Sequence, residues 1–162
     1  MAIERERKFM VDCTRLPLEA TRKGVVIEAG YFTEGPVAIR VTSRLGADVS
    51  KQKICFKGPG TEARQEFEYT IPNADAEALL KLSPTFLHKL RYEYQGWEID
   101  CIDLPAVDGT LARQLWVAEW EEAEGKPSIP SPLPEWITKE VTHLPQWYSN
   151  AALAWKYGKK AR

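Results

Sequence analysis

Charged side chains recur at alternate positions along several short segments of the chain. At the N-terminus, Glu4, Glu6 and Lys8 are separated by single residues. Further segments of this kind carry Arg64, Glu66 and Glu68; Lys89 and Arg91; Glu98 and Asp100; and Glu119 and Glu121. Carboxylates are hard oxygen ligands that suit Mg²⁺ or Mn²⁺, whereas guanidinium and ammonium groups bind phosphate oxygens. Together they are the groups that phosphoryl transfer requires.

The alternate spacing has a structural meaning if these segments are β-strands. Successive side chains of a strand point to opposite faces, so each charged set shares one face. Arg40 and Arg44 also share a face, and Lys57 stands near the end of another segment. The candidate phosphate-binding cations are Lys8, Arg40, Lys57, Arg64, Lys89 and Arg91. The candidate metal ligands are Glu4, Glu6, Glu68, Glu119 and Glu121.

The faces opposite two of these charged sets are apolar. Trp97, Ile99 and Cys101 oppose Glu98 and Asp100, and the segment of Glu119 has a comparable apolar face. Such faces should pack on another element, for example a helix, which leaves the charged faces turned the other way. Burying unpaired charge is costly, and buried ion pairs seldom stabilise a fold. We therefore expect the charged faces to line a water-filled, ligand-binding lumen.

The elements that must position these residues are mostly strands. Strands are predicted over residues 2–11, 25–32, 37–43, 50–57, 63–71, 88–94, 97–102 and 115–121. A helix is predicted over residues 74–82 with Asn73 as its N-cap, a loop over the proline-rich residues 126–134, and a final helix over about 149–156. Short connections favour antiparallel pairing, and charges inside the strands favour closure into a barrel. The expected fold is mainly β (α+β), an eight-stranded antiparallel barrel with a few flanking helices.

Length and composition limit the classes of function. The 162 residues fit one domain spanning the whole chain. The 22 Lys and Arg balance 23 Asp and Glu, without the basic excess typical of nucleic-acid-binding proteins. Three cysteines without C-x-x-C spacing indicate reduced thiols, which suit the cytosol. Neither an apolar signal region nor an apolar run of roughly 20 residues is present. We expect a soluble, cytoplasmic protein without a membrane or nucleic-acid partner.

The motifs occur in an order that resembles a known family. In chain order they are Glu4-x-Glu6-x-Lys8, Gly30-Tyr31, Arg40, Lys57 before Gly58-Pro59, Arg64-Gln65-Glu66-x-Glu68, Lys89-x-Arg91-Tyr92, Glu98-x-Asp100, Glu119-x-Glu121, Lys139-Glu140-Val141-Thr142 and Tyr148-x-Asn150. This set resembles the CYTH superfamily, the triphosphate tunnel metalloenzymes, over essentially the whole chain. The first motif alone is a weak pattern, and the ordered set is far more specific.

The resemblance implies an eight-stranded tunnel that binds a triphosphate-containing small molecule with Mg²⁺ or Mn²⁺ and hydrolyses it. By this analogy Glu4 and Glu6 bind one metal, and Lys8 lies near the scissile bond. Glu119 and Glu121 either hold a second metal or orient the attacking water. Lys8, Glu119 and Glu121 are therefore the catalytic candidates, and the cations clamp the phosphates. The oligomeric state, including a homodimer, stays open.

One departure from the family pattern lies in the third predicted strand. The family usually has Arg-x-Arg on one face, whereas this chain has Arg40-Val41-Thr42, with Arg44 one step further along the same face. We expect either that Arg44 substitutes for the second arginine or that triphosphate binds more weakly. Three functions stay open: hydrolysis of inorganic triphosphate, action on an organic triphosphate as a phosphatase or class IV-type adenylate cyclase, and binding of polyphosphate or nucleotides without turnover.

Overall fold

The computed structural model describes residues 2–45, 51–106, 112–123 and 125–160. Its strands are β1 (Ala2–Val11), β2 (Gly24–Tyr31), β3 (Ala38–Leu45), β4 (Lys53–Lys57), β5 (Ala63–Thr70), β6 (Thr85–Tyr94), β7 (Trp97–Leu104), β8 (Arg113–Glu121), β9 (Ile137–Glu140) and β10 (Lys159–Lys160). Its α-helices are α1 (Asn73–Leu82), α2 (Pro145–Tyr148) and α3 (Asn150–Tyr157), and its 3₁₀ helices are η1 (Cys13–Arg15) and η2 (Leu18–Thr21).

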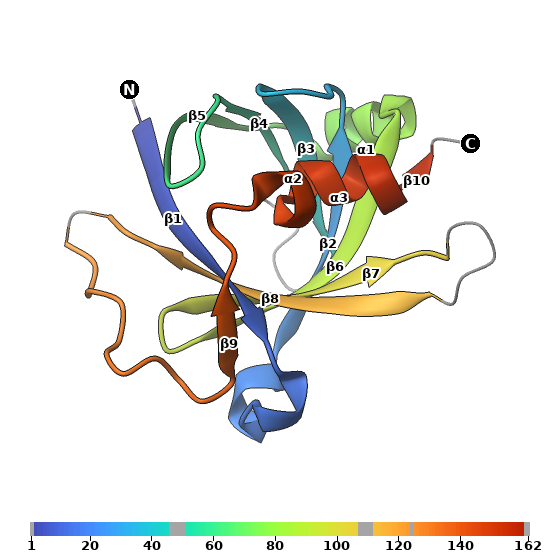
Figure 1. The fold of residues 1–162 in the computed structure, drawn as a ribbon. Helices are drawn as coiled ribbons and strands as arrows, with labels where there is room; N and C mark the ends of the chain where they lie inside the picture. The colour runs from blue at the N-terminus through green and yellow to red at the C-terminus, as the bar shows by residue number, and fades with distance from the viewer. Residues whose placement is uncertain (1, 46–50, 107–111, 124, 161–162) are drawn as a thin grey trace.

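Within the described ranges, β1 to β8 form a closed antiparallel barrel (Figure 1). The ring runs β1-β8-β7-β6-β2-β3-β4-β5, and β5 pairs back with β1. Outside the ring, β9 pairs with β1 and β10 pairs with β6. The predicted mainly-β fold with an eight-stranded antiparallel barrel is therefore confirmed.

The predicted elements differ from the observed ones mainly at their ends. β6 begins at Thr85 rather than at residue 88, and β4 begins at Lys53, since Lys51 and Gln52 are not in a strand and the predicted start at residue 50 lies outside the described residues. The prediction of Asn73 as N-cap is wrong. Pro72 occupies that position with φ −59° and ψ 149°, and Asn73 is already helical. Proline suits an extended N-cap because its ring fixes φ near −65°.

Five short elements were not predicted, namely β9, β10, α2, η1 and η2, and the final helix begins one residue later than the predicted start at about residue 149. The strand β9 and the helix α2 have four residues each, too few to display a period. The last helix was predicted from residue 149, but Ser149 is its N-cap, and its side chain accepts a hydrogen bond from the Ala152 backbone N–H at 3.1 Å. Within the described part of the chain, no helix combines the length and the apolar character needed to cross a bilayer.

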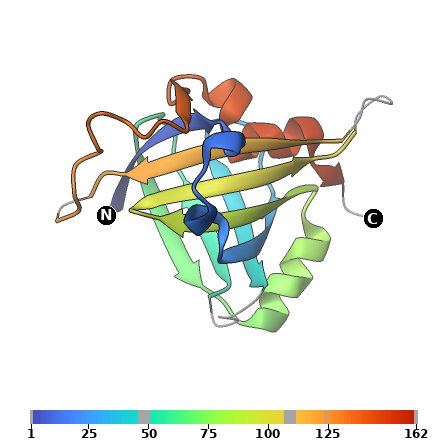
Figure 2. The ribbon, with the colours of Figure 1, turned by 90° about the horizontal axis from the view of Figure 1, so that it is seen from below.

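An apolar cluster covers the outer face of β1, β7 and β8. Trp97 lies at its centre, with edge-on ring contacts to Trp120, Trp136 and Phe9 at centroid distances of 4.9–5.5 Å. Trp136 follows the proline-rich loop, which confirms the loop prediction, and the η1–η2 segment crosses the same side of the barrel (Figure 2). The apolar faces predicted from the sequence thus pack against a loop and a 3₁₀ turn.

A second apolar cluster fills one end of the barrel beneath α3. It joins inward-facing side chains of β2, β6, β7 and β8 to Leu153 and Ala154. Thr85 and Trp155 hold the helix in place, since the Thr85 hydroxyl donates to the Ala154 carbonyl and the Trp155 indole donates to the Thr33 carbonyl, both at 2.7 Å. The charged lumen therefore occupies only part of the barrel interior.

Candidate functional site

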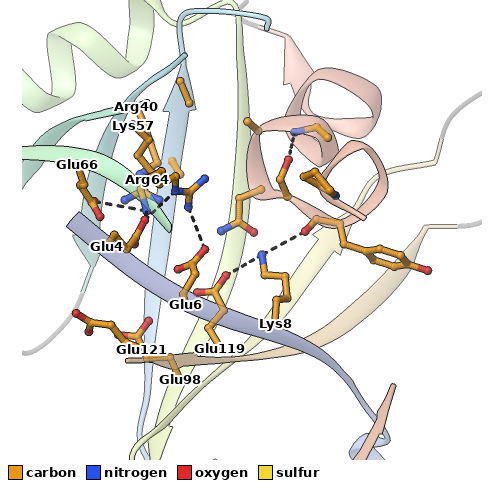
Figure 3. A pocket seen from close by; sticks show the side chains of 18 of the residues that line it. Glu4, Glu6, Lys8, Arg40, Lys57, Arg64, Glu66, Glu98, Glu119 and Glu121 are labelled. Carbon is orange, nitrogen blue, oxygen red and sulfur yellow. Dashed lines mark hydrogen bonds and ion pairs between the residues drawn. The ribbon is translucent and has the colours of Figure 1, made fainter. Parts of the chain in front are cut away.

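The barrel encloses a cavity of about 1200 Å³ that is lined by charged side chains of both signs (Figure 3). Its lining includes every site residue predicted from the sequence, namely Glu4, Glu6, Lys8, Arg40, Lys57, Arg64, Glu68, Lys89, Arg91, Glu119 and Glu121. The alternation of side chains along a strand explains why these residues from six strands meet here. The structure thus brings the predicted residues together, and their individual roles remain predictions.

At one side of the cavity, Glu4 accepts hydrogen bonds from two cations. The Lys57 ammonium lies 2.7 and 2.8 Å from the two carboxylate oxygens, and Arg64 Nε lies 2.9 Å from one of them. Arg64 also donates to Glu6 at 2.9 Å, and Lys57 lies 3.5 Å from Glu66. These contacts follow from strand register, because Glu4 is opposite Arg64 and Lys57 is opposite Glu66.

At another side, Lys8 and Glu119 form a buried ion pair across β1 and β8, where they are direct register partners. Burial alone would lower the pKa of Lys8, but the carboxylates of Glu119 and Glu6 outweigh it, and the pKa is raised. Burial would raise the pKa of Glu119, yet Lys8, Arg91 and Lys89 hold it well below its usual range. Lys8 is therefore a cation and Glu119 a carboxylate at neutral pH.

Asp100 is not among the residues that line the cavity, but it forms ion pairs with two cations that do line it. Arg91 donates two hydrogen bonds of 2.7 Å to the fully buried Asp100 carboxylate, and the Lys89 ammonium donates to it at 2.6 Å. Arg91 also donates to Glu119 at 3.0 Å and pairs with Glu98. From the sequence, Asp100 was noted as sharing a face with Glu98 and as part of the motif Glu98-x-Asp100, without an assigned role. The signal that could have singled it out was its place across from Arg91 on the neighbouring strand.

Desolvation makes Lys89 the weakest base among these cations. Its pKa is lowered to about 8 by burial and by the neighbouring Arg91 charge, against the opposing effect of Asp100. Burial would raise the pKa of Asp100, but Lys89 and Arg91 lower it overall. The charge of Lys89 is therefore sensitive to mildly alkaline pH, whereas Asp100 remains ionised.

The strand β3 differs from the others because its cations have no carboxylate partner among the described residues. Arg40 and Arg44 both line the cavity without an ion pair. The Nε atom of Arg40, the hydroxyl of Thr42 and the Oδ1 atom of Asn150 are buried without a hydrogen-bond partner within the described chain. Buried polar atoms are almost always satisfied, so these three mark positions that a ligand or water completes.

The remaining carboxylates lie nearer the edge of the cavity. Glu121 is exposed and lies 2.5 Å from the Lys126 ammonium, and Glu68 pairs with Lys53. The structure thus places the predicted ligands Glu68 and Glu121 in the cavity lining but away from the buried pair of Lys8 and Glu119.

Within the described residues, one group of three side chains has donor atoms close enough to share a metal ion: Cys55, Glu66 and Glu68, all within 4.8 Å of one another. The Cys55 thiol donates to Glu66 at 2.9 Å, and burial raises its pKa to about 12. A protonated thiol is a poor metal ligand. The oxygen donors of Glu4, Glu6 and Glu119 suit Mg²⁺ or Mn²⁺ chemically, although each of these three carboxylates faces a cation instead.

The sequence matches no family model and no curated protein. Among solved structures, the barrel is similar to a conserved hypothetical protein from Pyrococcus furiosus, with 19% identity and a TM-score of 0.47 over 75% of this chain and 80% of that one. It is also similar to the PH1012 protein from Pyrococcus horikoshii OT3, with 18% identity and a TM-score of 0.48 over 72% and 77% of the two chains. Neither protein's name states an activity.

Proposed function

We propose that this chain hydrolyses inorganic triphosphate, or a closely related triphosphate, with the help of Mg²⁺ or Mn²⁺. The observation that carries the proposal is the enclosed cavity in which six cations from five strands face a set of carboxylates. A fold gains little stability from burying so many charges. A compact polyanion and a divalent cation together would match both signs.

The cations supply the substrate contacts. Arg40, Arg64 and Arg91 present planar guanidinium groups, which suit the paired oxygens of a phosphate, and the lysines act as point charges. Because these side chains are largely shielded from bulk solvent, such charges act more strongly than at a surface. The Nε of Arg40 is buried without a hydrogen-bond partner in the described chain, and Arg40 forms no ion pair with a carboxylate there, which supports an anion as its partner.

The carboxylates would hold the metal. Glu4 and Glu6 offer oxygen donors for one ion, and Glu119 with Glu121 for a second ion or for the water nucleophile. A divalent ion bound there would neutralise and polarise phosphate oxygens. The Lys8 ammonium would stabilise negative charge that develops on the phosphoryl oxygens, and the ionised Glu119 would accept a hydrogen bond from water and orient it.

The test is release of phosphate from tripolyphosphate with Mg²⁺ or Mn²⁺. Lys8→Ala and Glu4→Ala should each lower kcat/KM by roughly 10²–10³-fold, the scale of a single electrostatic contact in an active site. Glu28→Ala is the matched control, because Glu28 lies on β2 outside the cavity and contacts His88. Wild-type activity in either lumenal variant would remove the assigned roles.

The other open functions are outcomes of the same assay. Cyclic AMP formed from ATP would replace hydrolysis with cyclisation. Faster release of phosphate from an organic triphosphate than from tripolyphosphate would reassign the substrate. Tight, metal-dependent binding without any product over hours would establish a binding module instead of an enzyme.

A further inference from the structure

The carboxylate of Glu4 lies where the cations around it would otherwise bind a phosphate. Three hydrogen bonds of 2.7–2.9 Å reach it, two from Lys57 and one from Arg64 (Figure 3). Converging ammonium and guanidinium donors on one anionic group are the usual geometry of phosphate recognition. Glu4 therefore satisfies, from within the chain, the same donors that a phosphate group needs.

The contacts of Glu4 compete with two other possible functions of the same three side chains. The donors of Lys57 and Arg64 that bind Glu4 cannot bind a phosphate at the same time. A divalent ion on Glu4 would lie close to the positive charges of Lys57 and Arg64, which repel it. The three side chains are 9–19% exposed, so water screens these competitions weakly.

We propose that Glu4 is an internal competitor for the anion subsite of Lys57 and Arg64, and that phosphate and metal binding are coupled through this contact. In the structure, Glu4 occupies the subsite. When a phosphate group binds Lys57 and Arg64, Glu4 is released and becomes available to a divalent cation. Metal on Glu4 in turn frees the two cations for phosphate. This inference rests on the proposed function, because it assumes a triphosphate in the cavity.

The coupling predicts opposite effects of one substitution in the two metal states. Without metal, Glu4→Gln removes the competitor, so inorganic tripolyphosphate should bind more tightly than to wild type. With Mg²⁺, the same substitution removes a metal ligand, so tripolyphosphate should bind more weakly. Coupling between two ligands typically spans roughly 5–150-fold, and we expect about tenfold in each direction. A Glu4 that serves only the fold or only the metal would give no tightening without metal.

The experiment is calorimetric titration of tripolyphosphate in EDTA and again in excess Mg²⁺. Glu93→Gln is the matched control, because it removes the same charge from the same cavity lining at an exposed position that has no assigned role in metal or phosphate binding. In EDTA, its effect should stay below about threefold, as expected for a solvent-exposed charge. Equal tightening in both variants would mean general charge repulsion and would overturn the proposal, as would unchanged or weaker binding in Glu4→Gln.

A reciprocal variant keeps the proposal testable if Glu4→Gln does not fold, as judged by circular dichroism. Lys57→Gln releases Glu4 from one cation, so Mn²⁺ alone, without any phosphate, should bind about tenfold more tightly in electron paramagnetic resonance titrations. Unchanged or weaker Mn²⁺ binding would overturn the coupling. Neither measurement depends on turnover, so its failure can be told apart from absence of phosphate release, which would refute only the hydrolase proposal.

Discussion

The ammonium nitrogen of Lys8 lies 2.7 Å from a carboxylate oxygen of Glu119, and each side chain is only 9% exposed. Lys8 also donates to the backbone carbonyl of Tyr148 at 3.2 Å, which ties the cavity wall to α2. Burying two charges costs desolvation energy that their attraction does not fully return. Removing one partner is worse, because the other charge is then buried without compensation.

Lys8→Met should therefore lower the free energy of unfolding by about 3 kcal/mol, near the low end for a broken buried pair, since Glu119 keeps Arg91. The double variant Lys8→Met/Glu119→Leu should be less destabilised than the sum of the two single variants, because it leaves neither of the two charges unpaired. Urea unfolding measures all three. Strict additivity would show that the two side chains do not interact energetically.

The depressed pKa of Lys89 predicts a pH dependence of binding. Phosphate needs the protonated ammonium, so affinity for tripolyphosphate should fall as pH rises above about 8, the pKa of Lys89 in the unliganded protein. Calorimetric titrations from pH 7 to 9.5 test this expectation. Lys89→Arg should flatten the profile, because a guanidinium stays charged throughout. An equally steep profile in that variant would assign the effect to another group.

The lowered pKa of Lys89 affects stability in the opposite direction to binding. Between about pH 8 and the ordinary lysine pKa of 10.5, the unfolded chain retains a proton that the native chain has lost. The free energy of unfolding then rises with pH as far as this one group is concerned. Lys89→Met should remove that contribution in urea titrations across this window, with wild type as the reference.

The sequence was sufficient to predict which side chains share a face, but not which ones pair. Alternation along a strand depends only on local geometry, so the lumenal positions of Glu4, Glu6 and Lys8 followed from their spacing. The contact of Glu4 with Arg64 joins residues 60 positions apart and depends on register between β1 and β5. Register and closure are tertiary properties, which no single segment contains.

The point at which the charged lumen gives way to apolar packing also could not be predicted from the sequence. The inward faces of β7 and β8 change from charged to apolar along their length, where Ile102 and Val117 pack beneath α3. In the sequence, an apolar residue on a charged face is only an interruption of the alternating pattern, whereas in the structure it marks the end of the lumen. The buried position of Asp100 depends on the same three-dimensional arrangement, because only strand pairing places Arg91 directly across from it.

Asp100 should be a positioning residue whose loss affects both stability and binding. Asp100→Asn removes the only carboxylate that holds both Lys89 and Arg91 among the described residues, so we expect about 3–5 kcal/mol of destabilisation and weaker tripolyphosphate binding. Asp103→Asn is the matched control. It lies three residues along the same strand, is exposed, and should change stability by less than about 0.5 kcal/mol. Equal effects of the two substitutions on stability and binding would show that Asp100 is not a positioning residue.

Loss of the Arg40 charge should increase stability but weaken ligand binding. Its Nε atom is buried without a hydrogen-bond partner in the described chain, and its neighbours Tyr31 and Cys55 are neutral at physiological pH, because burial raises the pKa of each. The charge of Glu66 acts on Arg40, but the two form no ion pair within the described residues, so a bound anion would complete the contacts of this guanidinium. Arg40→Gln should raise the free energy of unfolding by about 1 kcal/mol and weaken tripolyphosphate binding at least about tenfold.

Arg64→Gln provides the contrast, because it removes a cation from the same cavity whose two carboxylate partners, Glu4 and Glu6, are both present. That variant should lose stability as well as affinity, since Glu6 would be left without its guanidinium. Urea unfolding and calorimetric titration of both variants separate the two behaviours. If Arg40→Gln is destabilised to the same extent as Arg64→Gln, Arg40 already has its partner within the protein. In that case β3 does not form part of an anion-binding site.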